Sequence, residues 1–90
     1  MNFEWDEAKA TANFRKHKVT FEDASTIFEG HLSLTGRDPD HSLGEHRFIT
    51  FGLSAANRIL AVSHAERGDV IRIIIARPAT RMERKMYEED

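Results

Sequence analysis

An abrupt change from a strand pattern to a helix pattern, in the last third of the chain, constrains the fold more than any other feature. An apolar run rich in β-branched residues begins at Val70 and ends at Pro78. Thr80 and Glu83 then have the T-x-x-E spacing of a capping box, which predicts a helix beginning at Thr80. The apolar character of the run suits a central strand. The chain should therefore pass from an inner strand into a helix within a few residues.

Arginine residues gather at this predicted corner. Arg77 ends the strand, and Arg81 and Arg84 belong to the first turns of the helix. Guanidinium groups are planar, permanently charged and rich in donors, so a rigid corner that carries several of them suits a phosphate. Although the net charge of the chain is -2, residues 67–85 hold six basic and two acidic residues. This basic region predicts either a site for RNA phosphates or a docking surface for an acidic partner.

The remaining patterns predict an α+β fold. Asp6 and Thr20 are expected to cap two successive helices, and Gly30 is expected to end the second. Period-two alternation then predicts strands near residues 32–35, 47–53, 58–65 and 70–77, joined by short connections that favour an antiparallel meander. The expected architecture is an antiparallel sheet of about four strands, packed by two N-terminal helices and one C-terminal helix, with a possible short strand at residues 3–5.

Length and composition limit the class of protein. Ninety residues with 40% hydrophobic content suit one small domain, over residues 1–90. The chain has no cysteine, which excludes disulfides and cysteine-ligated zinc. No apolar run is long enough to cross a membrane, and the first residues lack the pattern of a signal peptide. We therefore expect a cytoplasmic protein with no membrane association.

Several motifs, taken in order, resemble the BrnT family of toxins from bacterial type II toxin–antitoxin pairs. They are F-E-W-D-E-A-K-A (residues 3–10), K-H-K-V-T-F-E-D-A (16–24), G-E-H-R (44–47) and I-R-I-I-I-A-R-P-A-T-R-M-E-R-K-M-Y (71–87). The resemblance covers essentially the whole chain. Two positions depart from the family pattern: Lys18 stands where glycine is usual, and Ile75 where serine is usual.

This resemblance implies a RelE-like fold and a ribonuclease activity that arrests translation. It also implies a cognate antitoxin, BrnA-like, with a ribbon-helix-helix part. DNA would then be contacted only through the complex with the antitoxin, which represses its own operon.

RNA cleavage without a metal needs a base, cations that stabilise the phosphorane and an acid for the leaving oxygen. Arg77 is the first candidate for charge stabilisation, with a salt bridge to Glu83 or to the acidic tail as the structural alternative. Arg67 and His64 flank a predicted hairpin beside the Arg77 strand, where they would supply a second cation and a base or acid. An ordinary solvated turn is the alternative for that pair.

Two further positions involve arginines on predicted strands. Glu45, two residues before Arg47, is a candidate base with a tuned pKa, although cross-strand pairing also explains it. By period-two counting, Arg72 and Arg77 should face opposite sides of the sheet. Arg72 is therefore interpreted as a structural or partner-facing residue.

A second set of residues is expected to bind RNA rather than react with it: Arg81, Arg47, Lys16, His17 and Tyr87. Lys16 and His17 lie on a helix stripe that would line the RNA backbone, and Tyr87 would stack on a base or donate to RNA. Solvated helix faces and, for Tyr87, the edge of the core are the alternatives.

The sequence thus predicts a metal-independent endoribonuclease toxin that needs no cofactor and is inhibited by its antitoxin. The main rival is a non-catalytic binding module whose basic corner docks an acidic partner or a nucleic-acid backbone. A metal-dependent hydrolase is a more distant alternative, since Asp38, Asp40, His41, Glu45 and His46 are ligand types for zinc or manganese without a compact spacing.

Overall fold

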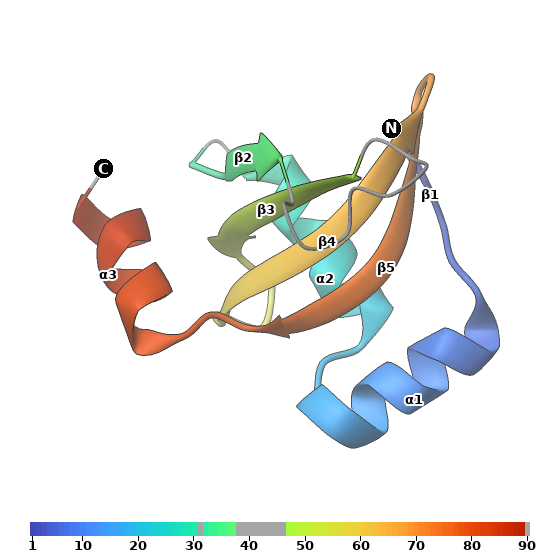
Figure 1. Cartoon of the computed structure of the whole chain (residues 1–90), viewed down its shortest axis with the longest axis horizontal. Helices are drawn as coiled ribbons and strands as arrows, with labels where there is room; N and C mark the ends of the chain where they lie inside the picture. Colours follow the sequence, from blue (N-terminus) through green and yellow to red (C-terminus); the bar gives the residue numbers. More distant parts are fainter. Residues whose placement is uncertain (31, 38–46, 90) are drawn as a thin grey trace.

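One sheet forms the fold, with the N-terminal helices on one side of it and the C-terminal helix projecting from the end of a strand (Figure 1). The computed structural model describes residues 1–30, 32–37 and 47–89. The elements are β1 (Asn2–Glu4), α1 (Glu7–His17), α2 (Phe21–Ser25), the 3-10 turn η1 (Thr26–Glu29), β2 (Leu34–Arg37), β3 (Arg47–Leu53), β4 (Ile59–Arg67), β5 (Val70–Pro78) and α3 (Arg81–Glu89). No helix in these ranges is long and apolar enough to cross a membrane.

Side-chain caps begin the helices at the predicted residues. The Asp6 carboxylate accepts from the Lys9 amide at 3.1 Å, and the Thr20 hydroxyl accepts from the Asp23 amide at 3.0 Å. Each cap satisfies one of the amide groups that a helix N-terminus leaves without an internal partner. The second helix is shorter than expected, because the α-helical turn gives way to the 3-10 turn η1 before Gly30.

Lys18 ends α1 in the left-handed conformation, with φ of 60°. Glycine adopts this conformation at little cost, whereas other residues are strained there. Lys18, which stands where glycine is usual in the family pattern, is therefore a less favourable helix cap.

The sheet has the strand order β1-β5-β4-β3-β2. Strands β2 to β5 form the predicted antiparallel meander, but β1 pairs in parallel with the start of β5, from Asn2 opposite Val70 to Glu4 opposite Arg72. The sheet is therefore mixed and five-stranded rather than antiparallel with about four strands. A three-residue strand is too short for its sequence pattern to indicate which strand it pairs with.

A β-bulge interrupts the register between β4 and β5. Ser63 lies opposite Ile75, whereas His64 lies opposite Ile73, so Ile74 is the extra residue. A bulge of this kind resets the alternation of side chains between the two faces. The prediction that Arg72 and Arg77 face opposite sides is therefore wrong, because both lie on one face.

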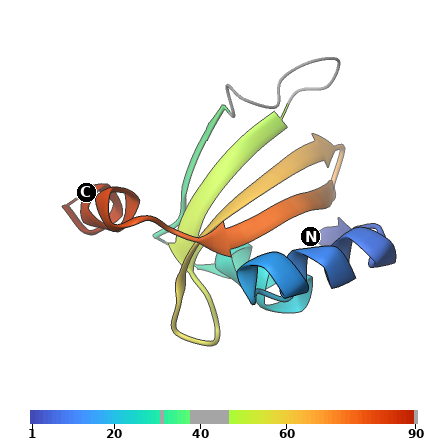
Figure 2. The same cartoon turned by 60° about the horizontal axis from the view of Figure 1, so that its bottom comes forward.

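The core lies between the helices α1 and α2 and the face of the sheet that is opposite Arg72 and Arg77, as Figure 2 shows for the helices and the sheet. Its fully buried members include Val19, Phe21, Ala24, Ile27, Leu60 and Val62. Phe21 meets the Trp5 ring edge-on, with centroids 5.9 Å apart. Glycine is required at position 52, since a Cβ there would lie 2.9 Å from the Cβ of Ile27.

Asn13 closes the edge of β5 beyond the end of β1. Its buried amide donates to the Ala76 carbonyl at 2.8 Å and accepts from the Ala76 amide at 3.1 Å, as a neighbouring strand would. It also donates to the Val19 carbonyl at 3.0 Å. The two bonds to Ala76 tie α1 to the sheet, and the bond to Val19 holds the connection that follows α1, so together they set where the last turn of α1 stands beside β5.

Helix α3 projects from the end of β5 rather than lying flat on the sheet (Figure 2). Met82 is 73% exposed and Met86 is 65% exposed. The predicted C-terminal helix is therefore present, but it covers only part of the sheet and leaves a groove beside it.

Candidate nucleic-acid site

Four arginines share the face of the sheet that lies away from α1 and α2. In the strand register Arg47 and Arg72 both lie opposite Ala65, and Arg77 lies opposite Ala61. Arg67 follows Ala65 by two residues on β4 and so points to the same side. We call this surface, defined by Arg47, Arg67, Arg72 and Arg77, the arginine face. It brings together three of the residues that the sequence proposed for the site, and it adds Arg72, which the period-two count had excluded.

Arg77 is anchored at the corner between β5 and α3. Its two terminal nitrogens donate to the Glu83 carboxylate at 2.7 and 2.9 Å. Glu83 also accepts from the Thr80 amide at 2.8 Å, while the Glu83 amide donates to the Thr80 hydroxyl at 3.1 Å, which completes the predicted capping box. The salt bridge considered as an alternative for Arg77 is thus present. It fixes the guanidinium to the first turn of α3.

The electrostatics of this corner keep Glu83 ionised. The hydrogen bond from Arg77 lowers the pKa of Glu83 to about 2, although burial opposes that shift. A carboxylate with so low a pKa is a poor proton acceptor near neutral pH. We therefore assign Glu83 to the positioning of Arg77 and not to acid–base chemistry.

The last turn of α1 brings Lys16 and His17 toward the same corner. Both line a shallow hollow with Asn13, Ile74 and Ile75 at the edge of β5. Burial lowers the pKa of His17, and the positive charges of Lys16 and Arg77 lower it further. His17 is therefore neutral at physiological pH and near a fixed cation, which suits a proton acceptor.

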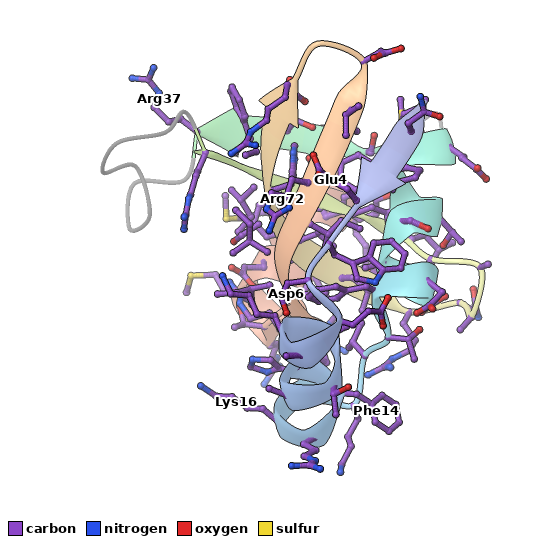
Figure 3. All side chains as sticks on the ribbon, turned by 90° about the vertical axis from the view of Figure 1, so that its right-hand side faces the viewer. Glu4, Asp6, Phe14, Lys16, Arg37 and Arg72 are labelled. Carbon is purple, nitrogen blue, oxygen red and sulfur yellow. The ribbon has the colours of Figure 1, made fainter. Side chains whose placement is uncertain are left out.

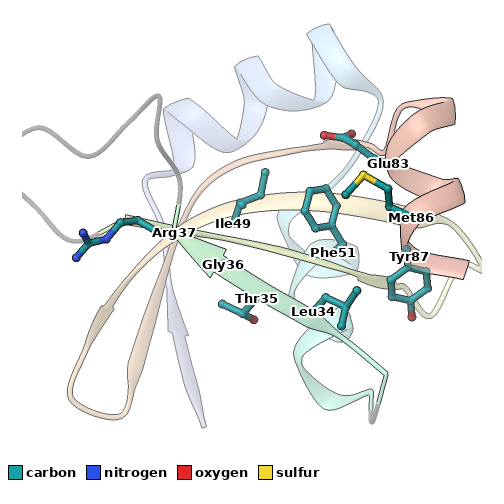
Figure 4. A pocket seen from close by; sticks show the side chains of 9 residues that line it. All are labelled: Leu34, Thr35, Gly36, Arg37, Ile49, Phe51, Glu83, Met86 and Tyr87. Carbon is teal, nitrogen blue, oxygen red and sulfur yellow. The ribbon is translucent and has the colours of Figure 1, made fainter. Parts of the chain in front are cut away.

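A groove of about 740 Å³ separates α3 from β2 and β3 (Figure 4). Its walls are mostly apolar, and they include Phe51 from β3 with Met86 and Tyr87 from α3. Glu83 closes the end of the groove where Arg77 is bound. An aromatic-lined space beside an anchored cation has the character of a nucleotide site, with a base against the walls and a phosphate at the cation.

Arg81 and Arg47 occupy different parts of the surface. Arg81 is exposed in the first turn of α3, the helix that forms one wall of the groove. Arg47 begins β3 on the arginine face, where its Nε atom is buried and has no hydrogen-bond partner among the described residues.

His64 lies on the opposite face of the sheet from Arg67 and Arg77. It is fully buried, its Nε2 atom is 2.7 Å from the Thr50 hydroxyl, and the rings of Phe28 and Phe48 pack on it. Burial lowers the pKa of His64 to about 4, so the ring is neutral in the folded protein. The structure does not bring His64 together with the arginines, because positions 64 and 67 of a strand point to opposite sides.

Glu45 lies outside the described residues, as do Asp38, Asp40, His41 and His46 of the alternative metal site. Within the residues that the structure does describe, no group of three or more metal-ligating side chains comes together.

Comparisons with known proteins identify the family to which the chain belongs. A family model described as "Ribonuclease toxin, BrnT, of type II toxin-antitoxin system" matches residues 5–83. The chain therefore belongs to the BrnT family of ribonuclease toxins, which confirms the resemblance seen in the sequence.

Among solved structures, the chain is similar to the crystal structure of the Brucella abortus ribonuclease toxin BrnT. The identity is 23%, the TM-score is 0.69, and the match covers 90% of this chain and 99% of that one. At this identity the likeness establishes a shared fold. No curated protein sequence matches the chain.

Proposed function

We propose that this protein is an endoribonuclease toxin that cleaves RNA without a metal ion and thereby arrests translation. The observation that carries the proposal is the placement of Arg77, which Glu83 holds at a corner between an aromatic-lined groove and the neutral His17. Membership of the BrnT family supports the reaction class. We also propose that the sheet and its helices are a variant of the RelE-like fold.

In the proposed reaction, the 2′-hydroxyl attacks the adjacent phosphorus and gives its proton to His17. The Arg77 guanidinium stabilises the negative charge that develops on the phosphorane. The 5′-oxygen then leaves with a proton from an acid or from solvent, so the products are a 2′,3′-cyclic phosphate and a 5′-hydroxyl. Glu45 remains an alternative base, and Arg67 a second cation.

RNA binding in this proposal involves the surroundings of the reacting phosphate. Tyr87 and Phe51 would hold a base in the groove, and Arg81 and Arg47 would contact other phosphates of the RNA strand. Lys16 would do so from α1, where its side chain extends away from the helix (Figure 3).

The direct test is cleavage of single-stranded RNA in EDTA. Replacing one preorganised charge-stabilising group typically costs about 10²–10³-fold in rate, so Arg77→Gln should lose activity by that factor. Arg84→Gln is the matched control, because Arg84 is exposed on α3, and it should stay within about threefold. Circular dichroism of each variant checks that it folds. Binding of RNA without cleavage by the unmodified chain would favour the binding-module interpretation, and cleavage that requires added metal would favour the hydrolase.

The role of His17 predicts a specific pH dependence. Activity should fall on the acid side as the ring becomes protonated, and the midpoint should lie below the ordinary value of about 6.5 because the pKa is lowered. His17→Gln should remove that acid limb together with most of the activity. An unchanged limb in His17→Gln would point to another base.

The antitoxin is the proposed partner. We propose that a ribbon-helix-helix antitoxin, BrnA-like, neutralises the toxin by covering the arginine face and the groove. Growth arrest on induction of this chain should be relieved by co-expression of the short adjacent reading frame. Relief by that reading frame without formation of a complex in pull-down would contradict direct neutralisation.

A further inference from the structure

Arg47 and Arg72 form a pair on the arginine face that the reaction at Arg77 does not use. Both lie opposite Ala65, one from each side, in strands β3 and β5. Neighbouring strands are about 4.8 Å apart, so the two backbones are about 10 Å apart with only the alanine methyl group between them. Ala65 is only 2% exposed, so a phosphate would contact the guanidinium groups above this residue rather than reach the floor between them.

The distance from Arg77 separates this pair from the reacting centre. Ala61, which lies opposite Arg77, is four residues from Ala65 on β4, or about 13 Å along the strand. Glu83 holds Arg77 toward α3. On the other side, a terminal nitrogen of Arg72 donates to a carboxylate oxygen of Glu4 in β1 at 3.1 Å. Figure 3 shows Glu4 and Arg72 next to each other. The two arginines are thus held toward opposite ends of the face, so they would serve different phosphates.

A phosphate can take the place of the contacts that Arg72 makes now. The side chains of Arg72 and Glu4 are 31% and 42% exposed, and an ion pair so accessible to water contributes little by itself. The Nε atom of Arg47 is buried without a hydrogen-bond partner in the part of the chain that the structure describes. Buried donors normally find an acceptor, so Arg47 has a donor that the described residues leave unsatisfied, and its side chain must turn to bring this atom to a ligand.

We propose that Arg47 and Arg72 form a second phosphate-binding centre, which holds the RNA backbone more than one nucleotide away from the phosphate at Arg77. This inference rests on the proposed function, since it assigns a substrate contact to the same face. The bulge at Ile74 is what makes the centre possible, because without it Arg72 and Arg77 would lie on opposite faces.

The test compares cleavage of a ribodinucleotide with cleavage of a single-stranded RNA about ten nucleotides long. Only the longer RNA can reach both centres, so Arg72→Gln should raise KM about fivefold to tenfold for the longer RNA and leave cleavage of the dinucleotide unchanged. Arg47→Gln should raise KM for the longer RNA by a similar factor. Binding of a ten-residue analogue that lacks 2′-hydroxyls is measured in parallel over a range of salt. Each variant should reduce the salt slope by about one.

Glu4→Gln is the matched control, because it breaks the same ion pair and keeps the cation. It should bind the analogue as well as the unmodified chain or better. Equal loss of unfolding free energy in Glu4→Gln and Arg72→Gln, with no change in analogue binding, would overturn the proposal in favour of a structural link between β1 and β5. The proposal would also be overturned if Arg72→Gln and Arg47→Gln weaken binding of the antitoxin but leave binding of the analogue unchanged.

The analogue separates this proposal from the proposed function. If the unmodified chain cleaves neither RNA, the nuclease proposal fails, and the effect of Arg72→Gln on analogue binding still decides whether the second centre exists.

Discussion

Ionisable groups have different surroundings on the two faces of the sheet, although both faces are built from the same strands. On the helix-covered face, His64 is buried among Phe28, Phe48 and Thr50 and stays neutral. On the arginine face, Arg77 and Arg72 form ion pairs with the carboxylates of Glu83 and Glu4. The hydrophobic core lies on one face, and the RNA contacts proposed above lie on the other. Substitutions on the two faces should therefore affect different properties.

The largest expected effect on stability belongs to the helix-covered face. Phe21→Ala removes a fully buried ring from the centre of the core, and such changes cost about 3–5 kcal/mol of unfolding free energy. Urea unfolding measures this loss. Activity per folded molecule should be unchanged, and a specific loss of activity in the folded fraction would show that the two faces are not independent.

His64 should make the protein less stable in mild acid. Its pKa is lowered to about 4 in the folded state, whereas the unfolded chain takes up the proton near 6.5, so stability is lost as the pH falls from 6.5 to 4. The limiting slope for one group is about 1.4 kcal/mol per pH unit. Urea unfolding across this range tests the prediction, with His64→Gln as the variant in which the slope should diminish. A slope that persists in His64→Gln must come from other groups.

Glu83 should have a smaller effect, in a more acidic range. Its pKa is lowered to about 2, so its contribution to stability is present above the ordinary value of 4.5 and is lost as the pH falls from 4.5 to 2. Glu83→Gln weakens the bonds to Arg77 and Thr80 and should cost about 1–2 kcal/mol near neutral pH. Thermal unfolding measures this cost. If Glu83→Gln lowers the activity of the folded protein, the carboxylate positions Arg77, as the corner geometry indicates. If it lowers only the free energy of unfolding, the contact is a purely structural link.

Local signals in the sequence were sufficient for the helix starts and for the meander. Asp6, Thr20 and Thr80 cap their helices as predicted, because a cap depends on residues within one turn. The parallel pairing of β1 with β5 was not predictable in this way, since it joins segments almost seventy residues apart. It depends on how α1 packs rather than on any pattern in the strand.

The site was predicted less completely than the fold. Arg77 and its contact with Glu83 follow from the strand–helix corner, and family membership was visible in the motifs. The place of Arg72 was missed because a bulge has no signal in a run of three isoleucines. His64 was grouped with Arg67 by nearness in the sequence, although strict alternation along β4 already places them on opposite sides.

The extra residue in β5 makes the position of the arginines depend on chain length as well as on residue identity. Removing Ile74 would leave every charged group in the sequence intact, yet it would turn one of the two arginines on this strand into the core. Substitution scanning cannot reveal such a dependence, whereas a single-codon deletion can. The number of residues between Arg72 and Arg77 therefore decides whether both arginines belong to the arginine face.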